Sequence, residues 1–506
     1  MLKKRGAGVI MHISSLPSQY GIGVFDKNCL EFVETLADMN FSYWQVLPFN
    51  PVDDSNSPYC SASAFAGNCL FIDPMGLYEM GLCSLSEVRS NIYAGSPYTA
   101  DYEFAAKTRM ELLKNAFLRI DEKLAVKIRE FENENPWLTD FSLFMAVKEA
   151  NNFKPWWQWD DEFARFNVFK EKHRYDYEER SAFWKFCQYI FFTQWQRVKD
   201  YANSKGIAVI GDMPIYVAMD SADVWANLPM FMIDGEKLSP EKVAGVPPDY
   251  FSEDGQLWGN PIYNWDAMKK DGYSWWLRRI GAALTVYDVV RIDHFRAFAS
   301  FWEVDAGSDT AKIGQWKKGP GMDFWSKVFK VYPDAPVIAE DLGVFGEDVV
   351  ELLNDTGFPG MKVVQFGFDS NSDSSHLPHN APINSVNYVG THDNNTILGW
   401  LWEANENDRR FALDYCGFEG DNWGDGGYKS KSCRKIIEAV WRSSSNTAMI
   451  AFQDMCGFGS DARMNIPGVP EKNWRFRTTK ETIDSIDREY FKRINSLFRR
   501  TYPQIK

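Results

Sequence analysis

Short apolar runs recur along the chain, and amphipathic stretches with helical spacing lie between them. Eight of these runs have the length of buried strands: residues 8–13, 43–48, 207–210, 289–293, 336–340, 361–368, 385–391 and 448–453. Strands that alternate with helical patterns predict βαβ units and a parallel sheet. Eight such units predict an α/β fold of the (β/α)8 type, a TIM barrel.

The spacing between the predicted strands is uneven, because two stretches are far longer than one crossover helix requires. Residues 76–185 contain long helical patterns and predict an inserted, mostly helical subdomain. Residues 217–270 are rich in Pro, Gly, Asp and Trp and predict an inserted loop subdomain over the cleft. The barrel would then comprise residues 1–75 with two strands, 186–216 with the third, and 271–506 with strands four to eight.

Charge and cysteine usage narrow the class of partner. The formal net charge of −14 argues against nucleic acid, because phosphate binding needs a Lys/Arg surplus. No apolar run approaches the roughly 20 residues of a membrane span, and the first residues lack the apolar region of a signal peptide. The 8 cysteines form no Cys-x-x-Cys pair. We therefore expect reduced thiols and a cytoplasmic monomer or homodimer that binds neither nucleic acid nor membrane.

Aromatic residues are abundant, at 16% of the chain with 20 Trp. Most of these rings are expected in a large core. A surplus of Trp and Tyr also suits sugar binding, because the apolar face of a pyranose packs on an aromatic ring.

Four acidic residues follow predicted strands, at the end where barrel enzymes carry their catalytic groups. They are Asp212, Asp293, Glu340 and Asp393, after the third, fourth, fifth and seventh strands. One such residue alone is often a helix N-cap. Several carboxylates at one mouth would repel one another, so the whole set, with Arg291 and His392 alongside, indicates a functional site.

Paired carboxylates suit the cleavage of glycosidic bonds. Arg291 and Asp293 are two residues apart and would share one strand face, so the cation should keep Asp293 ionised. Glu340 would face Asp293, and that charge should raise the pKa of Glu340, as a general acid requires. Alternation would turn Asp341 away from the cavity. A metal site is the rival use of such carboxylates, but no compact Asp-x-Asp-x-Asp loop is present, so we expect no metal and no cofactor.

A series of short motifs carries a family resemblance. They are His12-Ile13-Ser14-Ser15-Leu16-Pro17, Ser57-Pro58-Tyr59, Gly211-Asp212-Met213-Pro214, Gly245-Val246-Pro247-Pro248-Asp249, Gln256-Leu257-Trp258-Gly259-Asn260-Pro261, Arg463-Met464-Asn465-Ile466-Pro467-Gly468 and Asn473-Trp474-Arg475. Together and in this order, over about residues 8 to 477, they resemble the 4-α-glucanotransferases. These enzymes, also called amylomaltases or disproportionating enzymes, are relatives of the α-amylases.

The resemblance implies three catalytic roles: Asp293 as nucleophile, Glu340 as acid/base and Asp393 as transition-state stabiliser. It also implies a set of substrate-binding residues: Tyr59, Asp212, Asp249, Trp258, Arg291, His294, Asp369, His392 and Asn465. Asp249 and Trp258 would belong to a loop over the acceptor cleft. Strand alternation would turn His294 away from Asp293, so His294 can reach the site only if the strand ends before it.

The implied reaction is transfer of an α-1,4-glucan segment to the 4-OH of glucose or a malto-oligosaccharide, with amylose or other α-1,4-glucans as donors. Retention through a covalent glucosyl-Asp293 intermediate predicts roughly 5 to 5.5 Å between the carboxyl groups of Asp293 and Glu340. Two rivals remain open. A plain α-glucan hydrolase would use the same three carboxylates, and a catalytically inactive binding or scaffold protein would have the same barrel, although such proteins usually lose a carboxylate.

Overall fold

Eight parallel strands close into a barrel in the order β1-β14-β13-β12-β11-β8-β3-β2. The structure is a computed structural model that describes residues 2–248, 253–343, 346–370, 373–469 and 472–501. The barrel strands are β1 (Gly6–Ile10), β2 (Tyr43–Gln45), β3 (Ala208–Pro214), β8 (Val289–Asp293), β11 (Val337–Ala339), β12 (Gly360–Val363), β13 (Ser385–Tyr388) and β14 (Thr447–Ala451). Each strand pairs with the barrel strands before and after it along the chain, which confirms the predicted (β/α)8 barrel.

The predicted strands correspond one to one with the barrel strands, but most of their ends differ. The fourth matches at both ends, whereas the sixth and eighth stop at Val363 and Ala451. The apolar residues beyond these two ends belong to the 3-10 helix η7 (Val364–Gly367) and to α18 (Phe452–Cys456), which are largely buried. An apolar run records burial and not backbone conformation, so run length overestimates strand length here.

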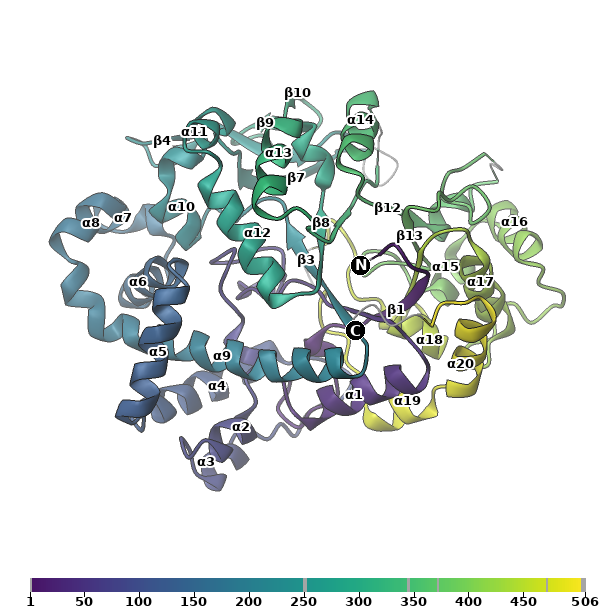
Figure 1. Ribbon diagram of the computed structural model, residues 1–506, viewed down its shortest axis with the longest axis horizontal. Coiled ribbons are helices and arrows are strands. Elements are labelled where there is room, and N and C mark those ends of the chain that lie inside the picture. Colours follow the sequence, from purple (N-terminus) through teal and green to yellow (C-terminus); the bar gives the residue numbers. More distant parts are fainter. Residues whose placement is uncertain (1, 249–252, 344–345, 371–372, 470–471, 502–506) are drawn as a thin grey trace.

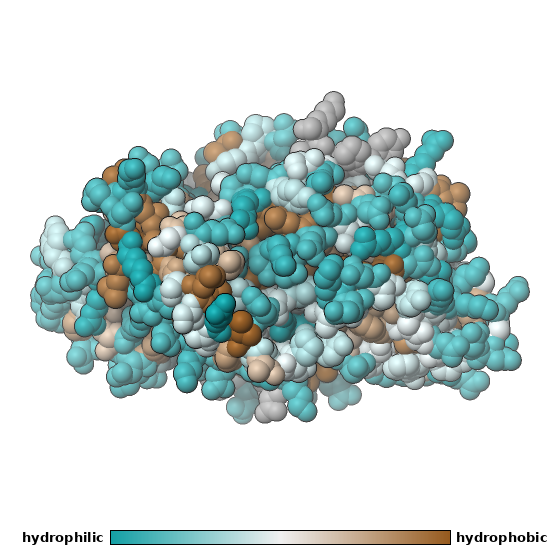
Figure 2. Space-filling model, turned by 90° about the horizontal axis from the view of Figure 1, so that it is seen from below, coloured by the Kyte–Doolittle hydropathy of each residue, from teal (hydrophilic) through white to brown (hydrophobic). Residues whose placement is uncertain are grey.

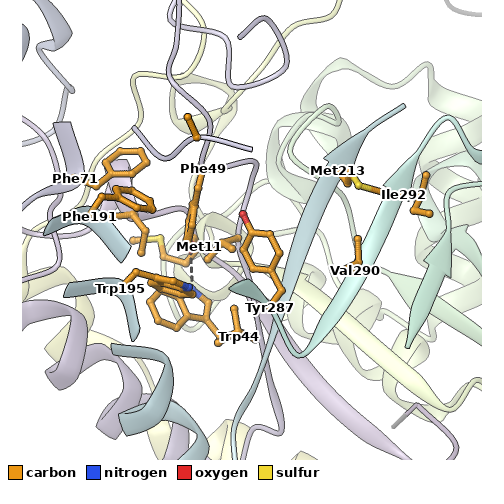
Figure 3. Packing of buried hydrophobic residues seen from close by; sticks show 14 of the residues in the cluster. Met11, Trp44, Phe49, Phe71, Phe191, Trp195, Met213, Tyr287, Val290 and Ile292 are labelled. Carbon is orange, nitrogen blue, oxygen red and sulfur yellow. Dashed lines mark hydrogen bonds between the residues drawn. The ribbon is translucent and has the colours of Figure 1, made fainter. Parts of the chain in front are cut away.

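Side chains on the strands alternate between two cores. Val289 packs in the cluster inside the barrel, whereas Val290 and Ile292 pack in the outer cluster between strands and helices. Figure 3 shows part of the outer cluster, where the ring of Trp195 lies edge-on at 4.6 Å from that of Phe49. This alternation leaves the even-numbered face of β3 and the odd-numbered face of β8 directed into the barrel.

Between β2 and β3 the chain is mostly helical. Its α-helices are α2 (Pro74–Glu79), α3 (Leu85–Arg89), α4 (Tyr102–Phe117), α5 (Glu122–Glu134), α6 (Trp137–Ala150), α7 (Asp161–Ala164), α8 (Phe166–Lys172) and α9 (Glu178–Ser204). Side-chain oxygens of Asp73, Ser84, Asp101 and Asp121 cap four of them at the N-terminus. The long helix α9 passes along the barrel and leads into β3 (Figure 1).

A four-stranded antiparallel sheet, ordered β10-β9-β6-β7, lies outside the barrel. Its strands are β6 (Lys242–Val246), β7 (Gln256–Pro261), β9 (Ser300–Asp305) and β10 (Gly314–Lys318), and a small hairpin pairs β4 (Ile233–Asp234) with β5 (Ser239–Pro240). These strands come from both sides of β8 in the chain and lie together in the upper part of Figure 1. The hydrophobic pattern along the chain does not predict this sheet.

The remaining α-helices lie between the barrel strands along the chain or follow the last one. They are α1 (Lys27–Asp38), α10 (Ala222–Ala226), α11 (Trp265–Lys270), α12 (Ser274–Val286), α13 (Gly321–Val331), α14 (Glu347–Thr356), α15 (Ile397–Glu403), α16 (Glu406–Cys416), α17 (Lys431–Arg442), α19 (Lys480–Ser485) and α20 (Arg488–Leu497). After α20, the buried side chain of Arg500 donates hydrogen bonds to the backbone carbonyls of Gly6 and Ser445. The end of the chain is thereby bonded to the segments that begin β1 and precede β14.

The surface is mainly polar. Hydrophilic residues cover most of the face in Figure 2, with hydrophobic patches between them. Among the described residues, no helix combines the length and apolarity that crossing a bilayer requires. All eight cysteines are unpaired thiols, and seven of them are buried.

Candidate active site

An ion pair between Arg291 of β8 and Asp212 of β3 lies at the mouth of the barrel. The strand register sets the two residues side by side. Nη1 of Arg291 lies 2.6 Å from each carboxylate oxygen of Asp212, and both side chains are buried. Burial alone would lower the pKa of Arg291, but the charges of Asp212 and Asp293 raise it well above its ordinary value. Arg291 is therefore a permanent cation at the centre of the site.

Asp293 ends β8 and points to the same face as Arg291, as strand alternation predicts. Nη2 of Arg291 donates to Oδ1 of Asp293 at 3.0 Å, and 29% of the Asp293 side chain stays accessible. Burial raises the pKa of Asp293 to about 6, although the charge of Arg291 lowers it. The predicted influence of Arg291 is thus present but is outweighed by burial. The carboxylate is still mainly ionised at neutral pH.

Glu340 directly follows β11 and is held by two backbone donors. The N–H of His294 donates to Oε2 at 2.7 Å, and the N–H of Leu342 donates to Oε1 at 2.6 Å. Burial and then the charge of Asp293 raise the pKa of Glu340 to about 8, against the lowering effect of Arg291 and the two donors. At neutral pH Glu340 is mainly protonated while Asp293 is mainly ionised.

The neighbouring residue, Asp341, faces away from these groups. Its Oδ1 accepts a hydrogen bond from the N–H of Met361 at 2.6 Å, and its Oδ2 lies 3.4 Å from Nζ of Lys362. Both charged side chains are buried in the outer layer. The alternation argument for Asp341 therefore agrees with its contacts.

Asp393 lies in the loop after β13, with two partners for its carboxylate. Nδ2 of Asn465 donates to Oδ1 at 2.6 Å, and Nε2 of His392 lies 3.2 Å from Oδ2. Burial alone would raise the pKa of Asp393, but His392 and Asn465 hold it at about 2. The side chain is 40% accessible, so an ionised carboxylate faces the open side of the mouth.

Tyr59, from the loop after β2, connects Asp212 with His392. Its hydroxyl donates to Oδ2 of Asp212 at 2.7 Å and lies 2.8 Å from Nε2 of His392. The two rings are stacked, with centroids 5.3 Å apart. Burial would lower the pKa of His392, but the charge of Asp393 raises it above its ordinary value.

His294 meets the condition that the sequence analysis set for it, because β8 ends at Asp293. The residue adopts a left-handed conformation with φ of 52°, and its ring lies edge-on at 4.7 Å from that of Trp258 on β7. The Trp258 ring remains 36% accessible and donates from Nε1 to Gln256 at 3.2 Å. Trp258 thus packs on the ring of His294, whose backbone N–H donates to Glu340.

The pattern of the 4-alpha-glucanotransferase family matches residues 11–482. The chain belongs to the 4-alpha-glucanotransferase family. A 4-alpha-glucanotransferase of Clostridium butyricum is 42% identical over 473 residues, which cover 92% of this chain and 95% of that protein. One from Thermus thermophilus is 41% identical, and the match covers 94% of each chain.

Among solved structures, this member of the 4-alpha-glucanotransferase family resembles an amylomaltase from Streptococcus agalactiae in complex with acarbose. The TM-score is 0.93 at 36% sequence identity, and the match covers 98% of this chain and all of the other. The amylomaltase of Corynebacterium glutamicum has a TM-score of 0.76 at 17% identity, covering 98% of this chain and 74% of that one, a likeness of fold alone.

The roles that the family resemblance implied for two further residues stay predictions. Asp249 lies outside the described residues. Asp369 is exposed in the loop after η7, and its role stays a prediction. Within the described part of the chain, no group of three or more His, Cys, Asp or Glu side chains is arranged to hold a metal ion.

The structure also brings in two residues to which the sequence analysis gave no role. Nη2 of Arg463 donates to the backbone carbonyl of Asp393 at 2.6 Å, and Nε donates to that of Asn465 at 2.7 Å. The ring of Trp474 lies 5.6 Å from Tyr59 and 5.9 Å from His392. Both residues belong to motifs that carried the 4-alpha-glucanotransferase resemblance, which was the available signal.

Proposed function

We propose that the chain transfers α-1,4-glucan segments to the 4-OH of glucose or a malto-oligosaccharide by a retaining double displacement. The observation that carries this proposal is the arrangement of two carboxyl groups: Asp293 accepts from the guanidinium of Arg291, and Glu340 is held by two backbone N–H donors. Burial raises the pKa of both, to about 6 for Asp293 and about 8 for Glu340. A retaining transglycosidase needs one ionised nucleophile and one protonated acid at the same pH. The activity named for the relatives supports the same reaction.

In the first step, the Asp293 carboxylate attacks C1 of a glucosyl unit while Glu340 gives its proton to the departing O4. The C1–O4 bond breaks, and the shortened glucan leaves from a covalent glucosyl-Asp293 ester. In the second step, the ionised Glu340 removes the proton of an acceptor 4-OH as that oxygen attacks C1, and Asp293 is released. Asp393 would hydrogen-bond the sugar hydroxyls as positive charge develops at C1.

The groups in contact with Asp293 and Glu340 support the protonation states that the two steps require. Arg291 keeps a cation beside Asp293 in both steps, and the donors to Glu340 favour its ionised form after the first proton transfer. We further propose that residues 217–270, with Trp258, cover the acceptor side of the site. The unpaired thiols fit a reducing compartment and support a cytoplasmic location.

Incubation with maltotriose as sole substrate tests the proposal. Transfer should produce glucose and a ladder of shorter and longer malto-oligosaccharides, measured by chromatography. Maltose and glucose alone would indicate a hydrolase, and an unchanged substrate would indicate a binding protein. A heat-denatured sample and the Asp293→Asn variant serve as blanks.

A further inference from the structure

The segment of residues 12–17, which carries one of the family motifs, lies behind His392 and has no role in the proposed mechanism. A small cavity of about 20 Å³ separates the two, and its lining includes His12, Ser15, His392 and Asn395. A space of roughly 10 to 15 Å³ is enough for one water molecule when polar partners surround it. The cavity therefore has the size of a single water site next to a residue of the candidate active site.

Three polar atoms on residues that line this cavity have no hydrogen-bond partner among the described residues. Ser15 Oγ, His392 Nδ1 and Asn395 Oδ1 are buried atoms without a hydrogen bond in the described part of the chain. Each belongs to a residue that lines the cavity. Buried polar groups are nearly always hydrogen-bonded, and a buried water usually makes about three bonds to groups of this kind.

The tautomer of His12 follows from its own contacts. The backbone N–H of Leu47 donates to Nδ1 of His12 at 3.2 Å, so Nδ1 is an acceptor. The ring is packed against Phe49 and Phe71, two residues labelled in Figure 3. Burial and the nearby His392 lower the pKa of His12 to about 3, so the ring is neutral and carries its proton on Nε2.

The other ring nitrogen of His392, Nε2, contacts Tyr59 and Asp393 of the candidate active site. Tyr59 gives its hydroxyl proton to Asp212, so its oxygen can only accept from Nε2 of His392. The same N–H is shared with Asp393. Nε2 is therefore a donor, and in the cationic form of His392 a second proton on Nδ1 needs an acceptor on the side of the cavity.

We propose that His12 and Ser15 are positioning residues for His392, and that they act through one water bound in this cavity. The water accepts from Nε2 of His12 and from Nδ1 of His392 and donates to Ser15 Oγ and Asn395 Oδ1. This arrangement orients the His392 ring toward Tyr59 and Asp393 and favours its protonated form. The inference rests on the proposed function of His392 as a residue that contacts the substrate.

Other charged and titratable groups also act on His392. Those that face it are Asp212, Asp293, Arg291, Asp393 and Tyr59 on the mouth side, and His12, Asp454 and Arg463 around the cavity. A test must therefore change the cavity side alone. His12 allows this, because its two nitrogens have different partners and two amide side chains mimic them separately.

The test compares His12→Asn with His12→Gln. The Asn amide keeps an acceptor near Nδ1 for Leu47 but removes the donor at Nε2, whereas Gln keeps the donor and removes the acceptor. If the inference holds, His12→Asn lowers kcat for maltotriose transfer about tenfold with little change in KM, the loss expected for one hydrogen bond in a charged network. His12→Gln should keep most of kcat and show mainly a lower Tm.

The protonation of His392 gives a second readout. The chain has six histidines, so imidazole ¹⁵N signals can be followed by NMR, with the His392 signal assigned from the spectrum of His392→Gln. We expect a lower pKa of His392 in His12→Asn and in Ser15→Ala, and no change in His12→Gln. A crystal structure should contain an ordered water within hydrogen-bond distance of His392 Nδ1.

Each failure has its own signature. Wild-type kcat and an unchanged His392 titration in His12→Asn would overturn the positioning role, as would an empty cavity at a resolution where neighbouring waters are visible. If His392→Gln is impaired in these cases, the proposed function still stands. If His392→Gln transfers as fast as the wild type, the assumed role of His392 in the reaction is itself wrong.

Discussion

Two buried charge clusters use consecutive residues after β11, Glu340 on the inner face of the barrel and Asp341 on the outer face, and they differ in charge balance. On the outer face, Asp341 is paired with Lys362, one anion to one cation, and both side chains are almost fully covered. On the inner face, Arg291 stands among Asp212, Asp293 and Glu340, one cation to three carboxyl groups. The outer pair is satisfied as it stands. The inner cluster has an excess of negative charge, which a proton on one carboxyl group reduces, and this is the property that acid/base chemistry uses.

The largest effect is expected from removing one charge of the inner cluster. Asp293→Asn keeps the size of the side chain but deletes the nucleophile, so kcat for maltotriose transfer should fall at least about a thousandfold. The same change should lower the pKa of Glu340, because it removes the charge that helps to raise it. The measurement is initial-rate kinetics on purified protein, with Tm as a check on folding. Retention of full activity would refute the nucleophile assignment.

The matched control is Asp341→Asn, one position after Glu340. It leaves Lys362 buried without its counter-charge, which costs on the order of 3 kcal/mol of folding free energy. Chemical denaturation should detect this loss, while the folded fraction should turn over at nearly the wild-type rate. A thousandfold loss of activity in this variant would show that the two faces are not functionally separate.

The pH dependence should show the inner cluster as a bell-shaped profile of kcat/KM. Activity falls below about pH 6, where Asp293 gains a proton and ceases to be a nucleophile, and falls above about pH 8, where Glu340 loses the proton that it must donate. Each limb should approach about tenfold per pH unit, and the two apparent values belong to the coupled pair. A profile that is flat from pH 5 to 9 would contradict the proposed split.

The smallest effect on the reaction is expected from a change to Trp258, the aromatic residue that borders the inner cluster. The outer pair is sealed by packed side chains, whereas the mouth is bordered by the partly exposed ring of Trp258. Trp258→Ala should lower the ratio of transfer to hydrolysis about fivefold, equivalent to about 1 kcal/mol of lost stacking and water exclusion. Product analysis on maltotriose measures this ratio. An unchanged ratio would mean that this ring does not favour the acceptor over water.

The sequence predicted the barrel well because its strands are short apolar runs at βα intervals, and β8 was predicted at both ends. The antiparallel sheet was missed because its pairing joins β6 and β7 to β9 and β10 across more than forty residues and through exposed strands, such as Gly314–Lys318, that lack an apolar pattern. Local periodicity cannot report a pairing of this kind.

The candidate site, too, could be predicted from the sequence only in part. Alternation was sufficient to set Arg291 beside Asp293 and to turn Asp341 outward. It could not decide the orientation of His294, because that depends on a left-handed residue directly after the strand. It also could not find Arg463, whose contact with the site is to the backbone carbonyl of Asp393, in a loop distant in the chain. The burial that sets the pKa of Asp293 is likewise a property of the assembled barrel and not of its neighbours in sequence.

The bonds of Arg500 to Gly6 and Ser445 have a consequence for how the chain is synthesised. Of the barrel strands, Gly6–Ile10 is made first, and one of its two partners, Thr447–Ala451, is made last. Until then one edge of the nascent sheet is open to pairing with other chains. Ribosomes that stall before Thr447–Ala451 has been made would therefore release chains in which this edge of Gly6–Ile10 is exposed, and these are the products that we expect chaperones and proteases to meet.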